Sequence, residues 1–100
     1  MTRRMEKVAD LLQSEIAELL RREVKHPALT DVMVSITRVE VSPDLGSARV
    51  HVSVMDTPEV EREVLRALEH TEPFLHRTLL KRLHMRTVPH LRFLADHSIA

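Results

Sequence analysis

The sequence predicts a single α+β domain in which helices cover one face of a three-stranded sheet. Apolar residues recur every three to four positions over residues 5–24 and again over 60–79, which is the helical period. Alternating β-branched residues fill 32–41 and 47–54 around a turn, and a third alternating segment covers 89–95. A hairpin followed by a strand that is reached through helices gives the order α-β-β-α-α-β, a two-layer α+β arrangement.

The composition fits one domain over residues 1–100, because a chain of this length buries roughly 60 to 70% of its unfolded surface. No run approaches the roughly 20 apolar residues of a membrane span. Residues 1–4 lead into a periodic helix and not into an apolar signal core, so we expect a cytoplasmic protein. The absence of cysteine excludes disulfides and thiolate metal sites. With Phe74 and Phe93 as the only aromatic residues, stacking of bases on a sheet is disfavoured.

The first helix is predicted over residues 5–24. Thr2 is a suitable N-cap, and His26-Pro27 should end the helix because the residue before proline avoids the α region. Three cations lie at the positive end of this helix's dipole, where they are mildly unfavourable: Arg3, Arg4 and Lys7. They indicate either an anionic partner or a solvated terminus.

The hairpin carries two local predictions. The alternation changes phase between Val32-Val34-Ile36 and Val39-Val41, so we expect a bulge or bend near Thr37-Arg38. Residues 42–46 form the turn, in which Asp44 can bond nearby backbone and Gly46, the only glycine, can take a positive φ.

A long apolar stripe continues from Val60 to Leu79, but Pro73 interrupts it. Proline removes the hydrogen bond to the carbonyl of Glu69 and pushes Glu72 toward an extended conformation. We therefore predict two helices, the first capped by Asp56 or Thr57, joined by a helix break at Thr71–Pro73. The second helix should bury an arc made of Leu75, Leu79, Leu80 and Leu83, with His76 partly buried in it.

Charge is distributed unevenly, although the formal net charge is zero. Residues 73–95 contain five Lys or Arg and no Asp or Glu, whereas 56–72 are rich in Glu. The break would expose the N–H groups of Phe74, Leu75 and His76, a favourable place for a phosphate, with Arg77 and Lys81 one and two turns further on. Nucleic-acid binding is therefore the leading interpretation; a solvated helix face is the alternative, and Glu72 beside the site counts against a phosphate there.

Little in the sequence indicates catalysis or metal binding. No nucleophile, base and orienting group cluster in the sequence, so we expect no enzyme activity. The seven histidines show no His-x-x-x-His or Glu-x-x-His pattern with an obvious third ligand. We expect neither a metal nor any other cofactor.

Two separated motifs stand out along the chain. The first is Val39-Glu40-Val41-Ser42-Pro43-Asp44-Leu45, followed by 48–54. The second is 83–93, Leu-His-Met-Arg-Thr-Val-Pro-His-Leu-Arg-Phe, followed by Asp96-His97-Ser98-Ile99. Together they resemble the ribosome-binding factor A family of small-subunit maturation factors. The first helix, with its exit at residues 23–27, is also similar, so the resemblance covers nearly the whole chain.

The resemblance implies a type II KH-like domain of order α-β-β-α-α-β. This family replaces the Gly-x-x-Gly loop of KH domains with an interrupted helix, typically broken at Ala-x-Gly, and the matching positions here read Thr71-Glu72-Pro73. It also implies a monomeric, cytoplasmic protein that binds the small ribosomal subunit and its ribosomal RNA, assists late maturation and rRNA processing in the immature particle, and supports growth in the cold.

From the charge pattern and this resemblance together, we expect RNA contacts from two groups of residues. One comprises Thr71, Pro73, Phe74, Leu75, Arg77, Lys81, Arg82, His84 and Arg86, and the other comprises Arg3, Arg4 and Lys7. Two other functions stay open: a protein-interaction module that uses the sheet face or the acidic helix, and a general KH-type RNA binder not tied to ribosomes.

Overall fold

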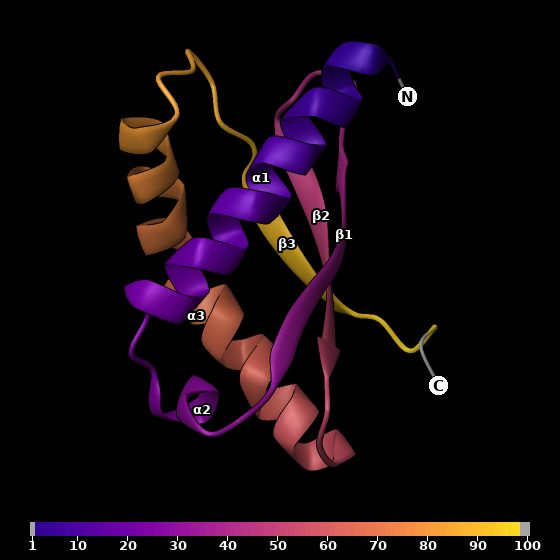
Figure 1. Ribbon diagram of the computed structural model, residues 1–100, viewed down its shortest axis with the longest axis vertical. Helices are drawn as coiled ribbons and strands as arrows, with labels where there is room; N and C mark the ends of the chain where they lie inside the picture. The colour runs from indigo at the N-terminus through magenta and orange to yellow at the C-terminus, as the bar shows by residue number, and fades with distance from the viewer. Residues whose placement is uncertain (1, 99–100) are drawn as a thin grey trace.

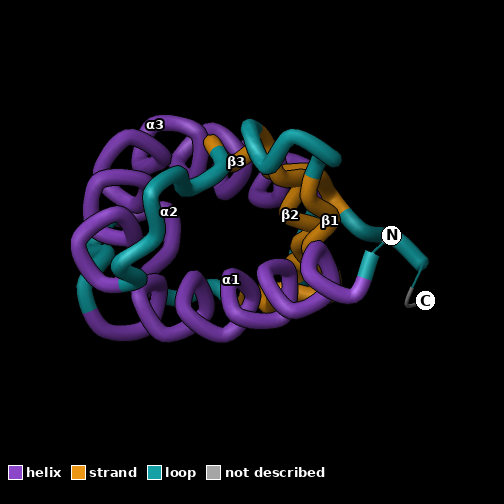
Figure 2. The backbone as a smooth tube through the Cα atoms, turned by 90° about the horizontal axis from the view of Figure 1, so that it is seen from above, coloured by secondary structure: helices purple, strands orange, loops and turns teal. Residues whose placement is uncertain are grey.

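The computed structural model describes residues 2–98. Its elements are α1 (Arg3–Arg22), α2 (Pro27–Thr30), β1 (Val34–Val41), β2 (Ser47–Val54), α3 (Pro58–Arg82) and β3 (His90–Ala95). The strands form one sheet of order β1-β2-β3, in which β1 and β2 are antiparallel and β2 and β3 are parallel. Helices α1 and α3 pack on the same side of this sheet (Figures 1 and 2). The predicted α+β class and strand arrangement are confirmed.

The predicted apolar stripes form the core between the helices and the sheet. The buried side chains are Ala9, Leu12, Ile16 and Leu19 from α1, Val64, Ala67, Leu68, Leu75 and Leu79 from α3, and Val39, Val41, Ala48, Val50, Val52, Leu91 and Phe93 from the strands. Leu80, which was expected in the same arc, is 39% exposed. It lies five positions after Leu75, and this rotation carries it past the edge of the buried face.

The N-caps of the two long helices are among the residues predicted from the sequence. Thr2 caps α1 by accepting a hydrogen bond from the N–H of Met5, and Thr57 caps α3 in the same way through Val60. Between α1 and β1 the chain forms α2, a single turn that the sequence did not predict. The Nδ1 atom of His26 caps this turn by accepting from the N–H of Ala28 at 3.1 Å.

The predicted bulge in β1 is present, since the pairing register shifts between Ile36 and Arg38. In the following turn Asp44 accepts a hydrogen bond from the N–H of Gly46 at 2.9 Å, as expected. The positive φ, however, is wrongly predicted at Gly46, because it occurs at Leu45, with φ of 58°. A Cβ at Gly46 would lie 3.2 Å from the Asp44 carboxylate, so the close approach of that carboxylate accounts for the glycine.

The bulge is tied to the end of β3 through Asp96. Thr37, the residue that the bulge leaves out of register, donates its hydroxyl to Asp96 Oδ2 at 2.5 Å. The other carboxylate oxygen accepts from the N–H and the hydroxyl of Ser98. These hydrogen bonds, those from Ser98 first and that from Thr37 second, hold the pKa of Asp96 well below its usual range.

A depressed pKa makes Asp96 a stabilising group above its unfolded pKa of about 4, and this contribution is lost as pH falls below that value. In Asp96→Asn we therefore expect a smaller loss of unfolding free energy between about pH 5 and pH 3 than in the wild type. Urea titrations across this range measure the effect. The exposed Asp31→Asn variant is the control, and equal acid sensitivity of the two variants would contradict the assignment.

Candidate nucleic-acid interface

Pro73 lies inside α3 and does not divide it. The helix is continuous from Pro58 to Arg82, so the expected pair of helices joined by a break at Thr71–Pro73 is corrected to one helix. In Figure 1 its earlier, salmon-coloured part runs diagonally and its later, orange part stands more upright. Proline bends a helix in this way because it removes one hydrogen bond and crowds the preceding turn.

Threonines on both sides of Pro73 reinforce this bend. The hydroxyl of Thr71 donates to the carbonyl of Ala67 at 2.7 Å, and that of Thr78 donates to the carbonyl of Phe74 at 2.9 Å. Such bonds to the residue four positions earlier compete with the helical ladder and favour curvature. The hydroxyl of Thr71 is therefore engaged within the helix.

A continuous helix removes the phosphate site expected at its second start. The N–H groups of Phe74, Leu75 and His76 lie within α3 and not at a helix start, so they do not form the predicted anion-binding end. Leu75 is 0% exposed and cannot contact RNA. These two expectations were wrong because the stripe from Val64 to Leu79 packs on the sheet as one surface and overrides the local preference of proline.

Glu72 has a structural contact that the sequence did not reveal. Its Oε2 atom accepts a hydrogen bond from the N–H of Leu91 at 2.8 Å and lies 3.5 Å from Nδ1 of His90, with only 15% of the side chain exposed. The N–H of His90 instead bonds to Gly46 O, toward β2, so that of Leu91 points to the free edge of β3. Glu72 therefore ties the bend of α3 to this edge.

Glu72→Ala is expected to lower the free energy of unfolding by about 1 to 3 kcal/mol, because it leaves a half-buried strand N–H without its charged acceptor. Urea denaturation measures this change. Glu69→Ala is the matched control, since Glu69 is exposed on the same helix, and it should shift stability by about 0.5 kcal/mol or less. Equal effects of the two variants would show that the contact does not stabilise the fold.

A stacked pair of histidines extends this junction. The rings of His76 and His90 lie 3.9 Å apart with an interplanar angle of 12°. His76 is half-buried, as predicted, and its Nε2 lies 2.8 Å from the carbonyl of Val88, to which it donates. Both rings hold the strand entry against the bend of α3, so neither needs a ligand to account for its position.

The exposed candidate residues gather toward one end of the molecule. Phe74, Arg77 and Lys81 lie on the later half of α3, which leads into the loop of His84 and Arg86. In Figure 1 this loop stands at the same end as the start of α1, which carries Arg3, Arg4 and Lys7. No ion pair within residues 2–98 engages these cations. His84 turns the chain with φ of 49°, a conformation that non-glycine residues rarely adopt.

Arg82 differs from its neighbours. Its guanidinium lies 3.0 Å from Glu15 Oε2 and 3.5 Å from Glu18 Oε1, and its side chain is 35% exposed. The contact with Glu15 is an ion pair without hydrogen-bond alignment. Arg82 therefore joins α3 to α1, and the expectation of an RNA-contacting role overlooked partners that are distant in sequence.

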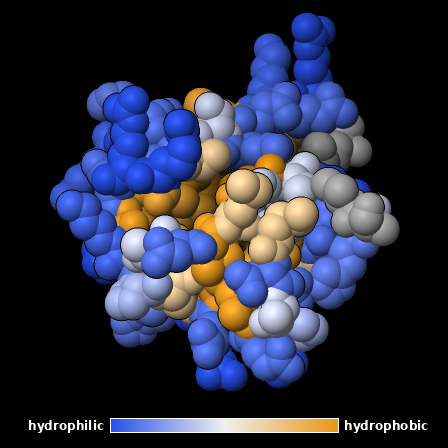
Figure 3. All heavy atoms as spheres, turned by 60° about the horizontal axis from the view of Figure 1, so that its bottom comes forward, coloured by the Kyte–Doolittle hydropathy of each residue, from blue (hydrophilic) through white to orange (hydrophobic). Residues whose placement is uncertain are grey.

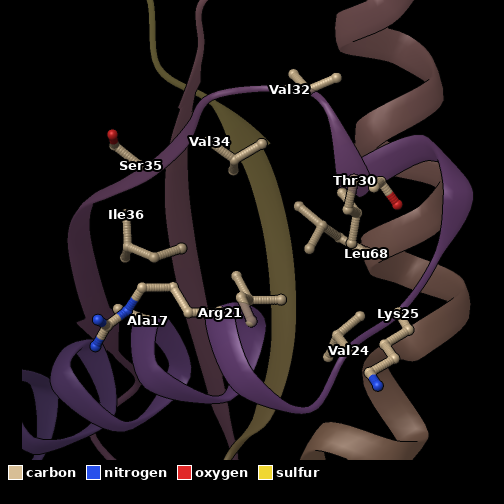
Figure 4. A pocket seen from close by; sticks show the side chains of 12 residues that line it. Ala17, Arg21, Val24, Lys25, Thr30, Val32, Val34, Ser35, Ile36 and Leu68 are labelled. Atoms are coloured by element: carbon tan, nitrogen blue, oxygen red, sulfur yellow. The ribbon is translucent and has the colours of Figure 1, made fainter.

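An apolar groove lies away from this basic end, with a volume of about 770 Å³. The later half of α1, the α2 segment and the start of β1 form its sides, and Leu68 of α3 lies at its base. Figure 3 shows apolar side chains gathered at the centre of this face. In Figure 4 the side chains of Val34, Ile36 and Leu68 surround the groove, whereas Arg21 and Lys25 extend from its margin. The apolar side chains of this groove offer no hydrogen-bond donor to a phosphate, and the groove lies apart from the basic end that carries the candidate RNA contacts.

The family model of ribosome-binding factor A matches residues 4–100. The chain belongs to the ribosome-binding factor A family. A Pseudomonas putida ribosome-binding factor A is 41% identical over 99 residues, which cover 97% of this chain and 74% of that protein. The Thermus thermophilus crystal structure of a family member is 26% identical with a TM-score of 0.80, covering 96% of this chain and 99% of the other.

A second T. thermophilus structure of the family concerns a complex. It is a homology model of ribosome-binding factor A fitted into a cryo-EM map of a 30S complex. It is 27% identical to this chain, has a TM-score of 0.73 and covers 91% of this chain and 93% of that one. The fold shared with these family members has the strand order and helix placement described above.

Proposed function

We propose that this protein binds the small ribosomal subunit through its ribosomal RNA. The observation that carries the proposal is the group of exposed cations at one end of the fold, with no ion-pair partner among residues 2–98, in a family with a member fitted into a 30S complex. The contacting residues are Arg77 and Lys81 on α3, Arg86 in the loop, and Arg3, Arg4 and Lys7 on α1. Phe74 and His84 lie beside these cations, and their side chains would contact the RNA at closer range.

These cations would bind the phosphate backbone. Lys and Arg at such a surface displace condensed counterions, so the logarithm of affinity should fall with the logarithm of salt by roughly 0.7 to 0.9 per phosphate contact. Phosphate contacts fix the position of a protein on RNA without reading its sequence. Recognition would therefore depend on the shape of a folded RNA site, which suits an assembly factor that acts on a particle.

The finer features of the proposal follow from the family resemblance. The protein would act as a monomer, with residues 1–100 as a single KH-like RNA-binding domain. It would work in the cytoplasm on the immature particle, where it assists late folding and processing of the small-subunit rRNA and supports growth in the cold. No helix in the described part of the chain is long and apolar enough to cross a membrane.

Sedimentation with purified small subunits tests this function. We expect the wild-type protein to migrate with immature small subunits at low salt and to be released as salt rises. Comigration that persists at high salt would favour the protein-interaction alternative, because contacts between apolar surfaces are not screened by ions. Equal affinity for unstructured RNA would favour a general KH-type binder.

A further inference from the structure

The open face of the sheet carries a second group of cations. Residues on the strands alternate between the core and this face, so Glu40, Arg49 and Arg92 form one row across the sheet through the pairs Glu40↔Arg49 and Arg49↔Arg92. The next row begins with the pair Arg38↔His51 and ends at Leu94. No helix of residues 2–98 covers this side (Figure 2).

Three groups converge on the carboxylate of Glu40. Its Oε1 atom lies 2.8 Å from Nε2 of His51, 3.5 Å from Arg38 and 3.6 Å from Arg49. These partners, the hydrogen bond from His51 first, lower the pKa of Glu40. The side chains of Arg38 and Arg49 nevertheless stay 64% and 62% exposed, so their remaining N–H donors face solvent.

Stability alone does not account for this arrangement. Arg49 and Arg92 are direct register partners on adjacent strands, and like charges in directly opposite positions destabilise a sheet. The bulge after Ile36 adds a third arginine, Arg38, to the same face. The carboxylate of Glu40 contacts two of these three guanidinium groups, those of Arg38 and Arg49, and Asp96 follows the end of β3 near His51. Three arginines against these two carboxylates leave this face with an excess of positive charge.

We propose that this sheet face binds a second segment of RNA backbone, with Arg38, Arg49 and Arg92 as its phosphate contacts. This inference rests on the proposed function, because it assigns a further surface to the same RNA partner. One guanidinium group can bind two oxygens of the same phosphate. The two rows of side chains on this face stand about 7 Å apart along the strands. Since α3 packs on the opposite side of the sheet, the protein would lie between two RNA segments.

Two variants with opposite expected effects test this surface. Arg49→Gln/Arg92→Gln removes two contacts and should weaken binding to purified small subunits about tenfold or more at low salt, with a log–log salt slope smaller by roughly 1.4 to 1.8. Glu40→Gln removes the negative charge but keeps an acceptor for His51 and the arginines, so it should strengthen binding severalfold. A gain of affinity cannot come from misfolding.

Unchanged affinity in both variants, or weaker binding in Glu40→Gln, would overturn the inference. If wild-type protein binds and Arg77→Ala/Lys81→Ala weakens binding while the sheet variants do not, the sheet surface fails and the proposed function stands. If the wild-type protein itself does not bind small subunits, both fail. A sheet face that served a partner protein would leave affinity for purified 16S rRNA unchanged in Arg49→Gln/Arg92→Gln, which also overturns the inference.

Discussion

Leu75→Ala is expected to lower the free energy of unfolding by about 2 to 5 kcal/mol. Leu75 is 0% exposed in the half of α3 that follows Pro73, and it packs in the core with Leu79 and Val88. Truncation removes apolar contacts and leaves a cavity that the surrounding side chains fill only in part. A loss of this size is large for a domain of about 100 residues, whose total stability is roughly 5 to 15 kcal/mol.

Leu80→Ala is the matched control for this prediction. It makes the same chemical change on the same helix, but Leu80 is 39% exposed, so urea denaturation should show a loss of about 1 kcal/mol or less. The pair also tests the course of α3 beyond Pro73. Similar losses in both variants would mean that the helix presents a different face to the sheet.

Features that depend on neighbouring residues were predictable from the sequence. The caps at Thr2 and Thr57 need only a hydroxyl beside a free backbone N–H, and the bulge follows from the change of phase before Val39. The end of α1 was predicted less well, because the helix ends at Arg22 with Glu23 as its C-cap, before His26-Pro27, and nothing in the sequence indicated that His26 would cap a further turn.

Features that depend on distant contacts were not predictable. The break at Pro73 was expected from a local cost of about 3 kcal/mol, but the apolar stripe on both sides of it packs on one sheet and keeps the helix continuous. The positive φ at Leu45 was also missed, although it lies within a turn made of neighbouring residues. At Pro73, tertiary packing outweighed the preference of the single residue.

The same distinction applies to the candidate interface. Its exposed cations follow from the uneven charge of residues 73–95, which can be read along the chain. The contacts of Arg82 with α1 and of Glu72 with β3 join positions far apart in sequence. Counting charges along the chain therefore could not distinguish these residues, which hold the fold together, from charged residues without such contacts. The row of Glu40, Arg49 and Arg92 becomes visible only when the strand register is known.

Arg77→Ala/Lys81→Ala is expected to weaken binding to small subunits about tenfold or more at low salt. Both side chains are exposed on the later half of α3 and have no ion-pair partner among residues 2–98, so removing them should cost phosphate contacts without disturbing the core. The log–log salt slope should fall by roughly 0.7 to 0.9 for each lost contact. Arg62→Ala/Arg66→Ala, on the acidic half of the same helix, changes the net charge equally and is the control.

The most direct test of an RNA interface at the basic end is therefore the affinity of these two double variants for purified small subunits, measured over a range of salt concentrations. Weakened binding and a smaller slope in Arg77→Ala/Lys81→Ala, with near wild-type behaviour in Arg62→Ala/Arg66→Ala, is the predicted result. If both variants lose affinity to the same extent, net charge alone governs the interaction. An interface at the end of α3 would then be contradicted.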